Sequence, residues 1–261
     1  MTHIQAIRPH EVVVGARPGV VYSPALGRFA DAWDELPIVM LEFCMSDGIV
    51  ALGEVGRGPG IQEIHSHLKS LIGVELRGLD LGVLPKPFRT GYQWGLLTAH
   101  PPALYSSPSP VTYAFEMALY DWLGKSRNCC MADLLGGAVR QRVPVYAWCG
   151  RQTPKDLRRI VTEARDRGFQ GIKIKSKLGD PTVEQVRAIK QAGGDQFGIT
   201  IDPMWQWLSP HAALHMLAGL EPLANNLCIE DPFPWEQPEM SHRVRQVTTV
   251  PLVLQSALWR Y

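Results

Sequence analysis

From about residue 143, short β-branched runs alternate with longer amphipathic stretches. The runs begin, at intervals of 25 to 28 residues, near Val143, Gln170, Gly198, Asn226 and Pro251. Helical patterns follow the first four runs, over residues 153–168, 181–193, 209–219 and 236–247. Strands that alternate with helices in this way predict a parallel sheet with right-handed crossover connections. The pattern therefore favours a (β/α) barrel.

Before residue 143 the pattern is mixed. Residues 37–56, PIVMLEFCMSDGIVALGEVG, are typical of two strands joined at an Asp-Gly turn. Helices are predicted over 61–73 and over 110–125, where Ser109 is a suitable N-cap and proline follows it. We therefore expect an α+β domain over residues 1–142, in which helices pack on an antiparallel sheet, and a partial barrel over residues 143–261.

The length of the second part limits the barrel. A complete eight-stranded barrel typically takes ~250 residues, whereas residues 143–261 supply four strand–helix units and a fifth strand. The sequence thus predicts an incomplete TIM-type barrel. Either the chain is truncated, or the open sheet is covered by another surface, because an exposed strand edge invites association. We expect a homo-oligomer on this ground.

Composition excludes several classes of protein. The chain is 46% hydrophobic and 20% charged, as in globular proteins, and its net charge of +1 gives no reason to expect a nucleic-acid partner. We see no signal-peptide pattern and no apolar stretch long enough to cross a bilayer, so a cytoplasmic protein without membrane contact is expected. The five cysteines show no CxxC spacing and are interpreted as reduced structural thiols.

Charged residues end three successive predicted strands. The segment FQGIKIKSKLGD, residues 169–180, places Lys173 and Lys175 on one face of a strand, and the next two strands end with Asp202 and Glu230. In such folds the chemistry collects at the carboxyl ends of the strands. Parallel strands are normally apolar on both faces, so charges there are costly unless they are paired or bind an ion.

These four residues suggest a metal site with a base beside it. Asp202 and Glu230 offer the hard oxygen ligands that suit Mg²⁺. Lys173 would balance the carboxylates of a substrate or ligand, and the like charges around Lys175 would favour its free amine, which can act as a base. Each residue alone has a plain structural alternative, such as a helix cap, a salt-bridge partner or a solvated strand face. Their conjunction on three consecutive strands favours a site.

The motifs together resemble the enolase superfamily, in its mandelate racemase/muconate lactonizing enzyme branch. DGIVALGEVG is similar to the hairpin of the family's N-terminal capping domain, and YAFEMALYDWLGKSRNCCMADLLGG to its long helix and the turn before VPVYA, the first barrel strand. GFQGIKIK, ITIDPMW and CIEDPFPW are similar to the ends of the second, third and fourth barrel strands. The resemblance covers nearly the whole chain and implies a capping domain followed by a TIM-type barrel.

The resemblance also implies a reaction. Lys175 would be the proton-abstracting base, Lys173 its electrostatic partner near the substrate carboxylate, and Asp202 and Glu230 two ligands of Mg²⁺. In the family a base removes the proton α to a carboxylate, and the metal stabilises the enolate. A racemase, cycloisomerase or acid-sugar dehydratase acting on a small hydroxy or sugar acid is therefore expected. Glu54, near the capping loop, and Trp205 are expected to contact this substrate.

The sequence departs from the family at the third metal ligand. A carboxylate should end the fifth strand, but VPLVLQSALWRY offers Gln255 or Ser256 there. Gln255 can supply a neutral carbonyl oxygen, which would weaken metal binding. Strands six to eight, which would carry the second acid/base group, lie outside this sequence. Two hypotheses thus stand: a Mg²⁺-dependent lyase or isomerase, and a catalytically inactive relative that serves as a binding or assembly protein.

Overall fold

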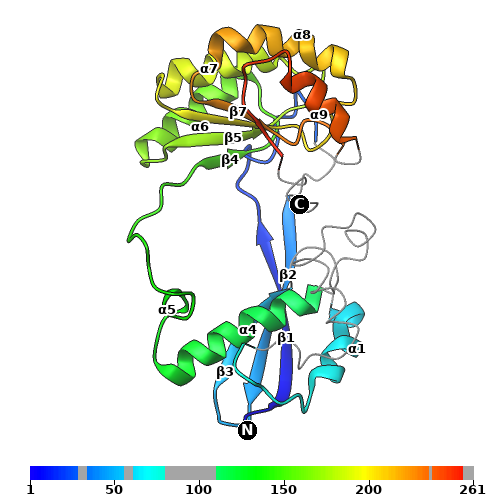
Figure 1. Ribbon diagram of the computed structural model, residues 1–261, viewed down its shortest axis with the longest axis vertical. Helices are drawn as coiled ribbons and strands as arrows, with labels where there is room; N and C mark the ends of the chain where they lie inside the picture. The colour runs from blue at the N-terminus through cyan, green and yellow to red at the C-terminus, as the bar shows by residue number, and fades with distance from the viewer. Residues whose placement is uncertain (29–33, 56–60, 80–109, 235–236, 255–261) are drawn as a thin grey trace. The chain divides into compact units, whose positions relative to one another are not determined.

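The computed structural model describes residues 1–28, 34–55, 61–79, 110–234 and 237–254. The chain divides into two compact units, drawn in Figure 1, and each is described by itself. The first unit contains Met1–Gly15 and Glu35–Gln141, and the second contains Ala16–Asp34 and Arg142–Leu258. The expected division into residues 1–142 and 143–261 stays a prediction.

The first unit is a three-stranded antiparallel sheet with helices. Its strands follow the order β1 (Ile4–Gly15), β2 (Glu35–Met45) and β3 (Val50–Val55). Its helices are α1 (Ile61–Leu71), α4 (Pro110–Arg127) and the short α5 (Met131–Leu134). The predicted hairpin is present as β2 and β3, and Gly48 in its turn adopts a φ of 85° that favours glycine. Strand β1 was not anticipated from the sequence.

The core of the first unit lies between its sheet and α4. Alternate residues of β2 are buried, as the period of two requires, and Phe43 meets Phe115 of α4 edge to face, with ring centroids 6.1 Å apart. Gly53 of β3 lets the helix come close, because a Cβ there would lie 2.0 Å from the carbonyl oxygen of Ala114. The sequence thus specifies an α+β unit with a well-packed interface.

The second unit is a parallel sheet whose five strands are hydrogen-bonded in chain order. The strands are β4 (Ala147–Cys149), β5 (Gly171–Lys175), β6 (Gly198–Asp202), β7 (Leu227–Glu230) and β8 (Leu252–Val253). The connecting helices, shown in Figure 1, are α6 (Pro154–Asp166), α7 (Thr182–Gly193), α8 (Pro210–Leu220) followed by the 3₁₀ helix η2 (Glu221–Leu223), and α9 (Pro238–Arg245). The mixed α/β fold class is therefore confirmed. Within the described residues the sheet is open at β4 and β8.

One predicted strand begins later than its sequence pattern suggests. The β-branched run was expected to start near Val143, but β4 begins at Ala147, and Val143 and Val145 are exposed. A single backbone bond of 3.3 Å, from the amide of Gln170 to the carbonyl of Val145, joins this run to the neighbouring strand. The apolar run therefore lacks the regular pairing that would extend the strand.

The two faces of the parallel sheet differ in chemistry. The helix-facing side is apolar and fully buried, for example at Ile172, Ile174 and Ile201. The alternate positions carry polar side chains, as at Lys173 and Thr200, which are register partners on β5 and β6. The helices therefore cover one face of the sheet, and the other face presents polar side chains that could form a functional site.

Residues 16–28 belong to the second unit, which the sequence pattern did not indicate. Tyr22 forms a parallel bridge with Arg151, just beyond β4. The buried side chain of Gln152 donates hydrogen bonds to the carbonyls of Gly19 and Val20, at 2.9 and 3.0 Å. This segment therefore follows the β4 edge of the sheet.

Among the described residues, no helix is both long and apolar enough to cross a bilayer.

Candidate functional site

Four charged side chains meet at the carboxyl ends of three neighbouring strands. Lys175 is the register partner of Asp202, and the pairing of Ile201 with Ile229 places Glu230 beside Asp202 at the same level. Lys173 lies two residues before Lys175 and therefore on the same face of β5. The structure thus brings together Lys173, Lys175, Asp202 and Glu230 within the second unit.

Their contacts form one ion-pair network. The Nζ atom of Lys173 lies 2.7 Å from each carboxylate oxygen of Glu230 and 2.9 Å from Oδ2 of Asp202. The Nζ atom of Lys175 donates to the same Oδ2 of Asp202 at 3.0 Å. The carboxylate of Asp202 therefore lies between two ammonium groups, and that of Glu230 is held by one.

Burial makes this pairing necessary. The side chains of Asp202, Lys175 and Glu230 are 6%, 8% and 15% exposed, while that of Lys173 is 30% exposed. Buried charges without partners would cost several kcal/mol, and each of these four has at least one. Burial alone would lower the pKa of Lys173, but hydrogen bonds and charge from Glu230 and Asp202 outweigh it and raise that pKa. Lys173 is therefore a cation at neutral pH.

The loop after β6 fixes the orientation of Asp202. Its Oδ1 accepts a hydrogen bond of 2.9 Å from the amide of Met204. Met204, Trp205 and Asp231 all have positive φ, which is uncommon for residues other than glycine and concentrates at functional sites. The amide of Trp205 donates to the carbonyl of Asp231 at 2.8 Å, so the loops after β6 and β7 are tied together.

The two carboxylates fit a divalent cation. Oxygens of Asp202 and Glu230 lie within 2.9 Å of one point, the ammonium nitrogen of Lys173. Carboxylate oxygens are the ligands that Mg²⁺ prefers, so an ion between them would have suitable donors once Lys173 moves aside. Among the described residues, no group of three or more His, Cys, Asp or Glu side chains could hold a metal. Gln255, the predicted third ligand, lies outside the described residues.

The remaining predicted contacts are dispersed. Trp205 lies in the loop after β6 and is half-buried, whereas Trp207, two residues later, is completely buried and belongs to the core. Glu54 lies on β3, in the first unit, opposite Met40. The roles of Trp205 and Glu54 in substrate binding stay predictions.

Sequence reasoning missed two polar residues beside the network. Thr200 on β6 and Cys228 on β7 are register partners, and their Oγ1 and Sγ atoms lie 3.4 Å apart. They precede Asp202 and Glu230 by two residues and so share their face of the sheet. The same period of two that singled out Lys173 and Lys175 would have found them.

Comparisons with known proteins agree with this architecture. Residues 156–260 match the family model described as "Enolase C-terminal domain-like". The chain is 31% identical over 147 residues to a D-galactonate dehydratase of Klebsiella pneumoniae, over 52% of this chain and 38% of the relative.

Solved structures are similar over almost the whole chain. An N-succinyl Arg/Lys racemase from Bacillus cereus has a TM-score of 0.72 at 19% identity, covering 98% of this chain and 66% of that one. An enolase from Bradyrhizobium, complexed with magnesium and mandelic acid, has a TM-score of 0.73 at 21% identity, covering 97% and 67%. These likenesses support the fold.

An antiparallel capping unit and a parallel (β/α) sheet with charged strand ends define a protein of the capping-domain and barrel type. The match over residues 156–260, the dehydratase and the structural neighbours confirm the resemblance, seen in the sequence, to the enolase superfamily in its mandelate racemase/muconate lactonizing enzyme branch. The aligned part spans about two fifths of the dehydratase, and the chain spans about two thirds of the racemase. The activity of the whole protein is accordingly a matter for proposal.

Proposed function

We propose that the protein abstracts the proton α to the carboxylate of a small hydroxy or sugar acid in a Mg²⁺-dependent reaction, as an acid-sugar dehydratase or a racemase. The observation that carries this proposal is the convergence of Asp202 and Glu230 on one point beside Lys175. The similarity to a galactonate dehydratase and to a structure complexed with magnesium and mandelic acid supports it. When bound, Mg²⁺ supplies Lewis-acid stabilisation of the negative charge that develops on the substrate carboxylate.

Each residue of the network would have its own role in the proposed reaction. Asp202 and Glu230 would hold the ion. Lys175, almost fully buried beside Asp202, would act as the free amine and take the α-proton on Nζ to become the ammonium form, and its burial keeps competing water away. Lys173 is the more exposed lysine and remains cationic, so once the carboxylates bind the ion its ammonium group can pair with the substrate carboxylate.

One observation favours the second hypothesis, an inactive relative that acts as a binding or assembly protein. Two ammonium groups and two carboxylates already neutralise one another in the network, so the fold has no electrostatic need of a metal there. The neutral side chain of Gln255 would add no negative charge to attract a metal ion. The two functions differ in whether α-proton exchange occurs.

The experiment is deuterium exchange followed by NMR. Galactonate, mandelate and related acids are incubated with the protein and Mg²⁺ in D₂O, and loss of the α-proton signal is measured. We expect exchange in the parent and its reduction by a factor of about 10² or more in Lys175→Ala, because a positioned base contributes that much.

Lys177→Ala is the matched control, since Lys177 is exposed and belongs to the same run of alternating lysines. It should leave the exchange rate unchanged. Absence of exchange with every acid in the parent would reject the enzyme and leave the binding protein. Assembly into a homo-oligomer, which we also propose, is tested by analytical ultracentrifugation, where a stable monomer would contradict it.

A further inference from the structure

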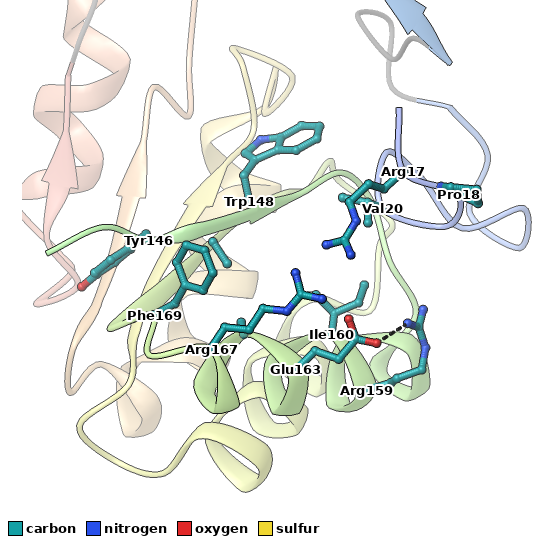
Figure 2. A pocket seen from close by; sticks show the side chains of 12 residues that line it. Arg17, Pro18, Val20, Tyr146, Trp148, Arg159, Ile160, Glu163, Arg167 and Phe169 are labelled. Carbon is teal, nitrogen blue, oxygen red and sulfur yellow. Dashed lines mark hydrogen bonds and ion pairs between the residues drawn. The ribbon is translucent and has the colours of Figure 1, made fainter. Parts of the chain in front are cut away.

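A cavity of about 460 Å³ lies in the second unit, away from the charged strand ends. Its walls come from residues 17–20, from β4 with the residue before it, and from α6 with the turn that follows (Figure 2). None of the four residues of the ion-pair network lines it. Its volume is within the range of small-molecule sites, ~300–1,000 Å³.

The cavity carries an excess of positive charge. Three arginines, Arg17, Arg159 and Arg167, line it together with one carboxylate, Glu163. Glu163 is paired with Arg159, at 3.5 Å. Within the described residues, no carboxylate lies within 4 Å of the guanidinium of Arg17 or Arg167. Figure 2 shows these two side chains reaching toward the middle of the cavity from opposite walls.

The rest of the lining is apolar and aromatic. Ile160 and Ala164 of α6 are buried there. Figure 2 shows the ring of Phe169 beside Arg167, whereas the ring of Tyr146 points away, toward Gly171 and Gly198. Planar or apolar groups pack favourably on such surfaces, and an arginine guanidinium can bind a carboxylate or phosphate through two parallel hydrogen bonds. The lining therefore matches a molecule with an anionic end and an apolar body.

The wall that carries Arg17 is firmly held. The amide of Gly150 donates to the carbonyl of Val20 at 2.9 Å, and the side chain of Gln152 donates to the same carbonyl and to that of Gly19. A wall fixed in this way lowers the ordering cost of binding, because little of it must rearrange.

We propose that this cavity is a binding site for a small organic anion, whose carboxylate or phosphate lies between Arg17 and Arg167 and whose apolar body contacts Phe169. The site is independent of the proposed proton abstraction, since no residue of the network takes part. Its two guanidinium groups select for charge and the ring of Phe169 for a planar body.

Calorimetric titration with phenyl phosphate and with inorganic phosphate tests the proposal. The parent should bind phenyl phosphate saturably and more tightly than phosphate, because only phenyl phosphate covers the ring of Phe169. Arg17→Gln and Arg167→Gln should each weaken binding about 10-fold, the equivalent of one lost charge-assisted hydrogen bond. Both residues are exposed, so the variants should retain the parent's melting transition.

Arg158→Gln is the matched control, because Arg158 lies on α6, is exposed and does not line the cavity. It should bind phenyl phosphate as the parent does. The proposal is overturned by absence of saturable binding in the parent at millimolar ligand. Equal weakening in Arg158→Gln would also overturn it, since that would show attraction to the general positive charge of the surface. Tighter binding of inorganic phosphate than of phenyl phosphate would reject the proposed contact between the apolar body of the ligand and the cavity.

Discussion

Replacing Asp180 by asparagine removes one charge from a buried ion pair. Asp180 binds the guanidinium of Arg151 through both carboxylate oxygens, one of them 2.8 Å from Nε. The two side chains are 2% and 4% exposed. Arg151 also donates to the carbonyls of Leu26 and Gly27, so the pair anchors residues 16–28 to the rest of the second unit.

The expected cost follows from burial. Removing one partner of a buried pair leaves the other charge without compensation and typically costs about 3–5 kcal/mol. Asparagine keeps the shape of the side chain, so packing changes little and the loss measures the charge. For a domain of this size the melting temperature should fall by roughly 10 °C.

Urea denaturation of Asp180→Asn, followed by circular dichroism, measures the change in the free energy of unfolding. Glu184→Gln is the control, because it breaks an exposed ion pair. The side chains of Glu184 and Arg187 are both 57% exposed. This control should lose no more than about 0.5 kcal/mol. A loss below about 1 kcal/mol in Asp180→Asn would refute the reasoning, and the attachment of residues 16–28 would then depend on other contacts.

Three further predictions follow from the second unit. Gly150→Ala places a Cβ 1.5 Å from the carbonyl oxygen of Val21, so the free energy of unfolding should fall by about 1–3 kcal/mol. The shift of the denaturation midpoint measures this loss, and an unchanged midpoint would contradict the close approach. The pKa of Asp156 is lowered, chiefly because the hydroxyl of Thr153 donates to its carboxylate at 2.6 Å, while burial opposes the shift. The ionised carboxylate therefore stabilises the folded protein above the ordinary carboxyl pKa, and this stabilisation is lost as pH falls below it. Asp156→Asn should therefore destabilise at pH ~7 and much less at pH ~3, and an equal loss at both would contradict the assignment. Lys173→Met leaves the carboxylates of Asp202 and Glu230 facing each other, so without metal the free energy of unfolding should fall by about 1–3 kcal/mol. Thermal unfolding with Mg²⁺ should recover part of this loss. A variant that is more stable than the parent without metal would show that the lysine pairing is dispensable.

The strand–helix repeat and the meeting of the charged strand ends could both be predicted from the sequence. Hydrophobic runs at a regular interval specify a parallel sheet, and strand periodicity then brings Lys175 and Asp202 to one level, as their register shows. Both inferences depend on local patterns, which a sequence displays directly.

Other features depend on contacts between distant segments and left no such pattern. The pairing of Arg151 with Asp180 and the packing of residues 16–28 join segments that no periodicity relates. The resemblance implied that Lys173 lies near a substrate carboxylate, which stays a prediction. The contacts of its ammonium group with Asp202 and Glu230 are seen only in the structure, because side-chain reach along a face is not encoded in sequence spacing.

Thermal unfolding with and without millimolar Mg²⁺ tests most directly the claim that Asp202 and Glu230 hold a metal. A ligand present at ~100 times its dissociation constant stabilises the native state by about 2.7 kcal/mol, which is readily seen as a higher transition temperature. The account predicts this rise in the parent and in Asp195→Ala, an exposed control, and its absence in Asp202→Ala. A parent transition that is indifferent to Mg²⁺, or an Asp202→Ala variant that still responds, would contradict it.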